Sequence, residues 1–428
     1  MGYSLSGPGH RSVAIGMAAA AAVAAAGCGS SDDKAASASA GGSTTATAAA
    51  PAAKLKGAPV KLGQIVSIDG TFAYPEIKAA AVAAVDGLNR AGGIAGHPVQ
   101  LISCNDSSDP NKGVACARKL VDEGVIAEVG GLDFLAEAKI GPILQAAGIP
   151  QVGDSPQSGG WASQDNTFLL YTSEQDTFAA AAPKYCLDQG KAKVADLQAP
   201  YPVVKAINKT FVKAAGAAGA KVAATPTVSV SSPDVAPVAR TLQSAGAQCI
   251  YPIVPPTQLL SIMKAGITLG LKAQYLIPTG TVGPKELKTF GSLADGNAVL
   301  SGYPVPTDTK SFPVLKEFQA DLERTGGPAG EPNLRGTALN AWFGVRAIAK
   351  VMEGATGPVT KTTLMAKLKA AKDVDLGLPV KWSPNSPPPA GESWKRVWNG
   401  HVYVHPIKGG EVTPGDGEPI DAFQFLQG

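Results

Sequence analysis

The chain has 428 residues, which is long enough for two or more domains. Apolar residues make up 45% of it, enough to build ordinary hydrophobic cores. The formal net charge is only +3 and the basic residues are spread along the sequence, so the composition gives no reason to expect a nucleic-acid partner.

The first residues are typical of an export signal. His10 and Arg11 are followed by Val13–Ala26, an apolar run of 14 residues that is too short to cross a bilayer as a stable helix. Such a run instead fits the apolar core of a signal peptide. We therefore predict that residues 1–27 form a signal peptide and that the protein is exported.

The end of this signal resembles a bacterial lipobox, because the small residues Ala26 and Gly27 precede Cys28. In a lipobox the cysteine becomes the lipidated N-terminus, and the third residue before it is usually leucine, whereas here it is Ala25. The alternative is a plain secretory signal with an incidental cysteine. Lipidation predicts a membrane contact through a lipid anchor, on the outer face of the cytoplasmic membrane or in the periplasm.

The next segment is predicted to be a flexible tether. Residues 28–57 would then comprise the lipidated cysteine and this tether. Gly29–Gly57 is rich in Ala, Ser, Thr and Gly and has almost no large apolar residue, so it cannot bury enough surface to fold. The root-mean-square span of 29 such residues is about 30 Å.

From Pro59 onwards, strand-like and helix-like segments alternate. In the first series, we predict helices that begin at Pro75, after Asp109 and near Phe134, and strands at Val60–Val66, Val99–Ser103, Val125–Gly130 and Pro150–Gly153. A second series begins near Asp176, with strands at Lys193–Leu197, Lys221–Val230, Gln248–Val254 and Gln274–Ile277. Repeated βα units with short loops predict an α/β fold with open parallel sheets flanked by helices.

The C-terminal part is predicted to add helices near Pro313–Arg324, Arg335–Glu353 and Thr360–Ala371. A β-hairpin is expected at the end, formed by Trp394–Trp398 and His401–Ile407 and turned by Asn399-Gly400.

No catalytic motif occurs in the sequence. There is no phosphate-binding Gly-x-x-x-x-Gly-Lys-Ser/Thr loop, no dinucleotide-binding Gly-x-Gly-x-x-Gly after a strand, no Gly-x-Ser-x-Gly elbow and no His-Glu-x-x-His. We therefore expect no enzyme, no cofactor and no metal. An exported βα protein without catalytic groups favours ligand binding, at the carboxyl ends of the strands.

Three segments carry a resemblance to a known family. Gly92-Gly93-Ile94-Ala95-Gly96, Asp109-Pro110-Asn111-Lys112-Gly113 and Cys116-Ala117-Arg118-Lys119-Leu120-Val121 resemble the leucine/isoleucine/valine-binding-protein family, the substrate-binding components of ATP-driven amino-acid importers. The resemblance implies the type I periplasmic-binding-protein fold, in which two Rossmann-like lobes are joined by three crossovers and close over a ligand. We place the crossovers near Tyr171–Glu174, Ser301–Pro304 and Trp398–Val402. Lobe I would comprise residues 58–174 and 303–398, and lobe II residues 175–302 and 399–428.

The resemblance also implies which loops contact the ligand. The family's contacts follow the strand ends of both lobes. They match Thr71, Phe72, Ala73, Tyr74, Asp133, Phe134, Asp154 and Ser155 in lobe I, and Tyr201, Pro255, Thr257 and Thr279 in lobe II. For each aromatic residue the alternative is core packing or a solvated loop.

Two departures from the family pattern concern the ligand. Amino-acid binders of the family offer small hydroxyl residues after the third strand for the ligand carboxylate, whereas this chain has Asp133-Phe134-Leu135. They also place an acid against the ligand ammonium, where this chain has Thr279. Because a desolvated zwitterion lacking both partners is costly, the ligand can differ from a leucine-like amino acid. Tyr74, Phe134 and Tyr201 suit a small apolar or aromatic metabolite.

Four cysteines remain after Cys28, an even number that suggests two disulfides in an exported protein. Three pairings are possible. We predict Cys104–Cys116 and Cys186–Cys249, because each pair then lies within one predicted lobe. Free buried thiols are the alternative.

The favoured function is therefore a monomeric solute-binding lipoprotein that captures a small-molecule ligand and delivers it to an ABC permease in the membrane. A ligand sensor that signals to a membrane partner is the alternative. Neighbouring permease and ATPase genes would favour transport, and a neighbouring kinase or regulator would favour sensing.

Overall fold

The computed structural model describes residues 55–133, 135–155, 164–170, 174–229, 231–386 and 399–426, all within one compact unit, Pro51–Gly428. The signal peptide, Cys28 and the tether up to residue 54 lie outside the described residues. Among the described helices, none is both long enough and apolar enough to cross a membrane.

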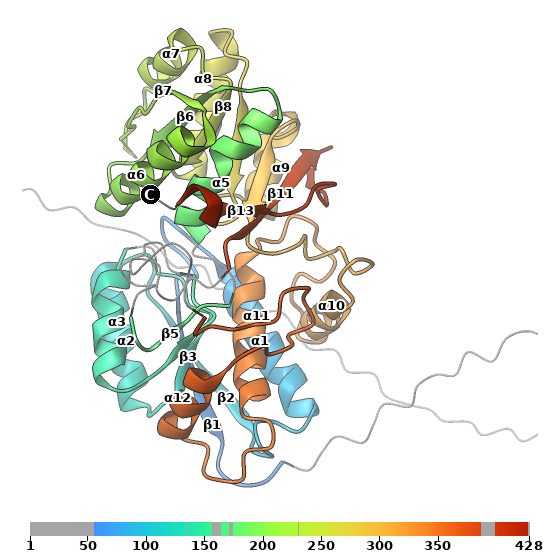
Figure 1. Cartoon of the computed structure of the whole chain (residues 1–428). Coiled ribbons are helices and arrows are strands. Elements are labelled where there is room, and N and C mark those ends of the chain that lie inside the picture. The colour runs from blue at the N-terminus through green and yellow to red at the C-terminus, as the bar shows by residue number, and fades with distance from the viewer. Residues whose placement is uncertain are drawn as a thin grey trace, which may run out of the picture. The chain divides into compact units, whose positions relative to one another are not determined.

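The N-terminal βα series forms a sheet of five parallel strands in the order β2-β1-β3-β4-β5 (Figure 1). Its strands are β1 (Val60–Val66), β2 (Val99–Asn105), β3 (Ala127–Val129), β4 (Gln151–Val152) and β5 (Thr167–Phe168). Strands β1 and β3 are almost wholly buried, as expected for parallel strands covered on both faces.

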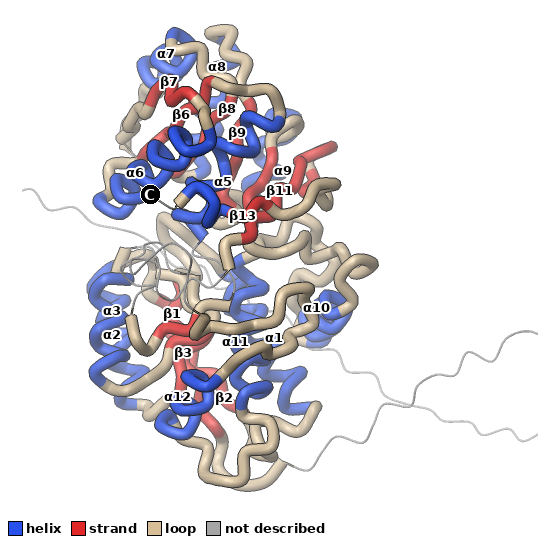
Figure 2. Tube along the Cα trace, in the orientation of Figure 1, coloured by secondary structure: helices blue, strands red, loops and turns tan. Residues whose placement is uncertain are grey.

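Helices cover both faces of this first sheet, as alternate residues of β1 show. Leu62 belongs to a core with helices α1 (Pro75–Arg90), α10 (Val314–Arg324), α11 (Thr337–Val351) and α12 (Lys361–Ala370). Ile65 points the other way, into a core with α2 (Pro110–Asp122) and α3 (Glu137–Ala146). Helix α11 therefore lies beside α1, although the two are far apart in the sequence (Figures 1 and 2).

The second series forms another parallel-dominated sheet, in the order β12-β11-β10-β9-β8-β6-β7. Strands β6 (Lys193–Gln198), β7 (Lys221–Ala224), β8 (Cys249–Ile253), β9 (Gln274–Pro278) and β10 (Ala298–Ser301) are parallel, and β11 (His401–Lys408) is antiparallel to β10. Strand β11 also pairs with β12 (Glu411–Val412) and β13 (Ile420–Asp421).

Helices flank the second sheet as well. Helices α5 (Glu174–Asp188) and α6 (Pro202–Ala218) pack together on one face, and α7 (Ala236–Ser244) and α8 (Pro256–Thr268) on the other. The short α9 (Pro284–Phe290) follows β9 and shares the core of α7 and α8. Two such sheets confirm the predicted α/β class.

The chain returns from the second sheet to the helices of the first just after β10. At this point the Tyr303 side chain is buried, and its hydroxyl donates to Asn340 Oδ1 on α11. The Tyr303 carbonyl oxygen lies 2.8 Å from His405 Nε2 on β11, so the crossing is tied to both halves of the molecule. The predicted crossing at Ser301–Pro304 lies here. The other two predicted crossings fall partly outside the described residues.

One predicted strand lies outside the described residues, and another is shorter than predicted. Trp394–Trp398, one arm of the predicted hairpin, lies outside the described residues; the hairpin that is described joins β11 to β12 through Gly409-Gly410, both with positive φ. Strand β7 ends at Ala224, whereas the prediction ran to Val230. Pro226 lacks an N–H and cannot continue the ladder, although its carbonyl still accepts from Gln198 N.

Both disulfides join the cysteines that the sequence analysis pairs. Cys104 in β2 is bonded to Cys116 in α2, and Cys186 in α5 to Cys249 in β8. Each bond fastens a helix to a strand of its own sheet.

Candidate functional site

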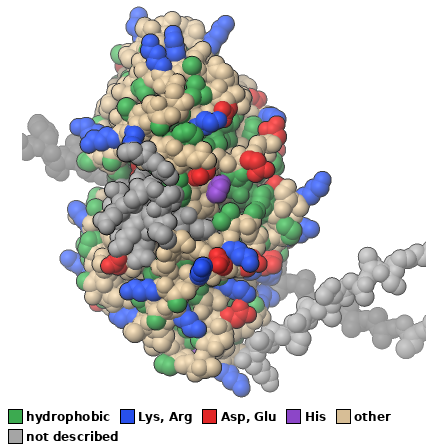
Figure 3. All heavy atoms as spheres, in the orientation of Figure 1, with side chains coloured by type: hydrophobic (Ala, Val, Ile, Leu, Met, Phe, Trp, Pro, Cys, Tyr) green, Lys and Arg blue, Asp and Glu red, His purple; other side chains and the backbone are tan. Residues whose placement is uncertain are grey.

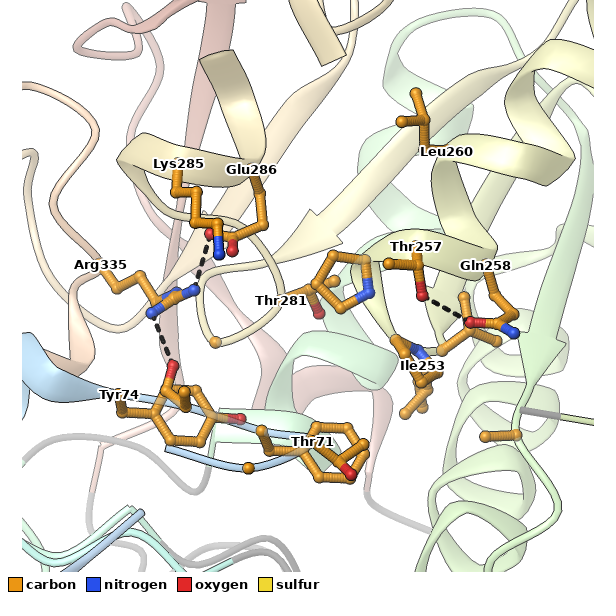
Figure 4. Close-up of a pocket in the computed structure, with 18 of the residues that line it drawn as sticks. Thr71, Tyr74, Ile253, Thr257, Gln258, Leu260, Thr281, Lys285, Glu286 and Arg335 are labelled. Atoms are coloured by element: carbon orange, nitrogen blue, oxygen red, sulfur yellow. Dashed lines mark hydrogen bonds and ion pairs between the residues drawn. The ribbon is translucent and has the colours of Figure 1, made fainter. Parts of the chain in front are cut away.

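A cavity of about 650 Å³ opens where loops at the carboxyl ends of the two sheets meet (Figure 4). Its walls come from the loops after β1, β6, β8 and β9, with Arg335 just before α11. This is where open α/β sheets bind ligands.

A second cavity of about 360 Å³ lies against β11 and carries three carboxylates, Asp308, Asp416 and Glu418. It does not lie at the strand ends of both sheets. On the face shown in Figure 3, Lys and Arg side chains stand alone at the top, while basic and acidic side chains are interspersed over the middle and lower parts. The larger cavity is therefore the candidate site.

The loop after β1 is held in a fixed shape. Gly70 has φ +98°, and a Cβ there would lie 2.3 Å from the Ser107 carbonyl oxygen, so only glycine fits. Ser108 Oγ accepts from Phe72 N at 3.0 Å and donates to Phe72 O at 3.2 Å. Tyr74 N donates to Ser67 O at 2.7 Å. These bonds present Thr71–Tyr74 to the cavity.

Three helices begin at the cavity wall with proline at their first position. Tyr74 precedes Pro75 of α1, Tyr201 precedes Pro202 of α6, and Pro255 precedes Pro256 of α8. Proline suits this position because its ring fixes φ and the missing N–H needs no partner there. Tyrosine and proline at the preceding position provide no side-chain cap, so the helix N-termini are not shielded by one.

Aromatic side chains bridge the two halves at the cavity. The rings of Phe72, after β1, and Tyr201, after β6, meet edge to face with centroids 6.3 Å apart. Both residues are half-buried, whereas Tyr74 is only 5% exposed. Ile253, Leu260 and Phe290 add apolar surface.

Arg335 makes the charged contacts of the cavity wall with both halves of the molecule. Its side chain is 7% exposed, and Nη1 donates to Glu76 Oε1 at 2.5 Å and to Ala73 O at 3.1 Å. Nη2 donates to Glu286 Oε2 on α9 at 2.9 Å (Figure 4). The guanidinium carbon lies 5.3 Å from the centroid of the Tyr74 ring. Although burial opposes the charge, Glu76 and Glu286 raise the pKa of Arg335 above its ordinary value.

Arg335 and its neighbour also connect the halves through close backbone contacts. Gly336 N donates to Thr279 Oγ1 at 2.8 Å, at the end of β9. A Cβ on Gly283 would lie 3.0 Å from the guanidinium carbon, so the backbone before α9 lies directly against Arg335.

Seven residues of the predicted ligand set line this cavity: Thr71, Phe72, Ala73, Tyr74, Tyr201, Pro255 and Thr257. Thr279 lies apart from it, with its hydroxyl bonded to Gly336 N. Asp133, Asp154 and Ser155 do not line it either. Phe134 lies outside the described residues.

Asp133, Asp154 and Ser155 instead make hydrogen bonds within the protein interior. Asp133 Oδ1 accepts from the N–H groups of Leu135 and Ala136, before α3. Asp154 Oδ1 accepts from Gly131 N at 2.9 Å. Ser155 Oγ accepts from Asn340 Nδ2 at 2.6 Å.

Two of these acids are paired with other buried carboxyls. Burial, aided by the hydrogen bond and charge of Asp106, raises the pKa of Asp133 to about 8. Burial also raises the pKa of Glu128 well above its usual range, and the charge of Asp154 adds to the effect. Both shifts favour the protonated form of a buried carboxyl in the folded first half.

Sequence reasoning missed the charged residues of the site, namely Glu76, Lys285, Glu286 and Arg335. One signal pointed to Arg335: it precedes Thr337–Val351, a helix whose residues are almost all buried. A charged residue leading such a helix needs a buried partner.

Comparison with known proteins places the chain in a family. Residues 59–411 match the sequence profile of the family described as periplasmic binding protein. A Brucella abortus protein named Leu/Ile/Val-binding protein homolog 2 is 24% identical over 334 residues, covering 76% of this chain and 87% of that protein.

Solved structures show the same fold. The isoleucine complex of a branched-chain amino acid transporter substrate-binding protein from Streptococcus pneumoniae has a TM-score of 0.70 and 18% identity, covering 85% of this chain and 99% of that one. An R. palustris ABC-transporter solute-binding protein in complex with 4-hydroxybenzoate has a TM-score of 0.68 and 22% identity, covering 85% and 97%. The fold is thus that of the type I periplasmic binding proteins. With a profile match over most of its length, the chain belongs to the periplasmic binding protein family, whose members bind solutes and are not enzymes.

Proposed function

We propose that this protein is the extracytoplasmic solute-binding component of an ABC importer and that it captures a small ligand in the cavity between the two sheets. The observation that carries the proposal is the composition of that cavity. Loops from both halves enclose about 650 Å³, a volume suited to a small organic molecule, with aromatic side chains on both walls and few charged groups.

The ligand that fits best is a small metabolite with an apolar or aromatic body. Phe72 and Tyr201 face each other from opposite halves, so a flat or apolar ligand gains contact area when the halves close. The relatives support this range, because one structure contains isoleucine and another 4-hydroxybenzoate.

The test is a thermal-shift screen of amino acids, aromatic acids, amides and small apolar metabolites, followed by calorimetric titration of each hit. A ligand at one hundred times its dissociation constant stabilises the folded state by about 2.7 kcal/mol. We expect at least one compound to raise the melting temperature, and Tyr201→Ala to abolish most of that rise. A screen in which no compound shifts the melting temperature would contradict the proposal.

Delivery to a permease is the second part of the proposal. The ligand-loaded protein should stimulate ATP hydrolysis by the reconstituted permease encoded beside it, and the ligand-free protein should not. If the neighbouring genes encode a kinase or regulator and no permease responds, the sensor alternative replaces transport.

We further propose that Cys28 carries a lipid and that the residues from 29 to 54 tether the binding unit to the membrane; the predicted tether ran to Gly57, but Lys56 N donates to Gly96 O at 2.9 Å, so residues 55–57 belong to the folded unit. Several acyl chains hold a protein stably at a bilayer, whereas one binds marginally. Cys28→Ala should therefore move the protein from the membrane fraction to the soluble fraction. Unchanged partitioning of the variant would leave a plain secretory signal as the explanation.

A further inference from the structure

The charges around the cavity do not match an amino-acid ligand. The charged side chains in its described walls are Lys285, Glu286 and Arg335. The single carboxylate, Glu286, already accepts from Arg335 and from Gly283 N at 3.0 Å. An ammonium group entering the site would have to compete with the chain's own guanidinium for this carboxylate.

Positive groups remain available at the same wall. Lys285 forms no ion pair in the part of the chain that the structure describes, and its side chain borders the cavity. Arg335 Nε is buried and has no hydrogen-bond acceptor among the described residues. The N-termini of α1, α6 and α8, which no side chain caps, begin at the cavity wall and add partial positive charge there.

Arg335 holds this arrangement in place. It is bonded to Glu76 in the first half and Glu286 in the second, while Gly283 packs against its guanidinium. Without Arg335, the carboxylates of Glu76 and Glu286 would both lose their ion-pair partner, and Glu286 would become an acceptor for a ligand ammonium.

We infer that Arg335 determines the charge selectivity of the cleft: it occupies the position of a ligand cation at Glu286, so that the site takes carboxylates without an ammonium group and rejects amines and zwitterionic amino acids. This inference rests on the proposed function, because it assumes that the cavity is the ligand site.

Four probes of similar aromatic shape separate charge from fit: benzoate, benzamide, benzylamine and phenylalanine. Calorimetric titration of the wild-type protein should show benzoate binding at least tenfold more tightly than benzylamine or phenylalanine, with benzamide between. Benzylamine or phenylalanine binding as tightly as benzoate would overturn the inference. If the broad screen yields only other ligands, a carboxylate without an ammonium group supports the inference and an ammonium-bearing ligand contradicts it.

The variant that tests Arg335 is Arg335→Gln combined with Glu76→Gln, which removes the guanidinium without leaving Glu76 as a buried unpaired charge. We expect the preference for benzoate over benzylamine to fall at least tenfold. Arg346→Gln is the matched control, because Arg346 lies on α11 away from the cavity and pairs with the exposed Glu317. An unchanged preference in the double variant would overturn the inference.

A milder variant covers the case in which the double variant does not fold. Glu286→Gln keeps an oxygen for Arg335 and for Gly283 N. Because the variant removes the one carboxylate of the described cavity wall, benzoate affinity should increase, and any decrease would overturn the inference. If no compound of any charge binds the wild-type protein, the proposed function fails first; if compounds bind without regard to charge, only the role of Arg335 fails.

Discussion

The carboxyl pair formed by Asp106 and Asp133 predicts an unusual dependence of stability on pH. Asp133 is 2% exposed, and the pKa of its carboxyl is raised to about 8 by burial and by Asp106. The folded state therefore keeps a proton that the unfolded chain releases above about pH 4. Stability from this group is fully present below that pH and is lost as the pH rises towards about 8.

The magnitude follows from linkage. One proton bound only by the folded state changes the free energy of unfolding by at most about 1.4 kcal/mol per pH unit, or roughly 3 kcal/mol between pH 5 and pH 7. Asp133→Asn should remove this slope, because asparagine keeps the Oδ1 acceptor for Leu135 N and Ala136 N and its amide can donate to Asp106. The variant should thus be more stable than the wild type at pH 8, and less so or not at all at pH 5.

The assay is urea unfolding at pH 5, 6, 7 and 8 under non-oxidising, non-reducing conditions that preserve both disulfides. Asp109→Asn serves as the control, since Asp109 also accepts from two backbone N–H groups at the start of a helix but is only half-buried. If Asp133→Asn and the control show the same slope of unfolding free energy against pH, Asp133 is ionised in the folded protein and the reasoning is wrong.

Three further predictions follow from the packing. Tyr201→Ala should weaken binding of the screened ligand at least tenfold, which is about 1.4 kcal/mol or more. Because Tyr201 is half-buried, the melting temperature of the ligand-free protein should change little. A large drop in that temperature would show that Tyr201 is a core residue. Replacing Cys186 and Cys249 by alanine should lower the free energy of unfolding by about 4 kcal/mol, and replacing Cys104 and Cys116 by roughly 3 kcal/mol. The difference arises because the first disulfide closes a loop of 63 residues and the second a loop of 12. The reverse order in denaturant unfolding would contradict the chain-entropy argument. Gly130→Ala should lower the free energy of unfolding by more than about 2 kcal/mol, since the added Cβ would lie 2.2 Å from Ala341 Cα. Gly124→Ala is the control: Gly124 also has a positive φ but has open space around it, so this change should cost about 1 kcal/mol in the same denaturant assay.

Much of the fold could be predicted because its signals are local. Buried β-rich runs, prolines at helix starts and Asp109 as a helix cap are each decided by a few neighbouring residues; Asp109 does accept from Asn111 N and Lys112 N. The aromatic positions Tyr74 and Tyr201 were expected for another reason: the family resemblance implies ligand contacts just after strand ends, and each of these tyrosines stands between a strand end and a proline that begins a helix.

The charged part of the site could not be predicted, because its contacts are distant in sequence. Arg335 lies 259 residues from Glu76 and 49 from Glu286, and nothing local connects them. Conversely, Asp133 and Asp154 follow strands as ligand residues do, yet each finds a buried carboxyl neighbour and a backbone N–H nearer than the cavity. A position at a strand end thus indicates the edge of the sheet, while the neighbouring charges decide what the side chain contacts.

The Arg335–Glu286 pair also bears on how the two halves open. Among the ion pairs of the described residues, it is the one that joins elements of the two sheets. When the cleft is closed the pair is poorly accessible to water, where a charge–charge attraction is strong. Opening would expose it to solvent, where such a pair is worth about 0–1 kcal/mol. Under the proposed hinge closure, the attraction would therefore grow mainly at the end of closure, which favours two distinct states over a graded series. Because the same guanidinium borders the ligand cavity, a ligand that contacts Arg335 in the closed state changes the balance between those states only through its different affinity for them.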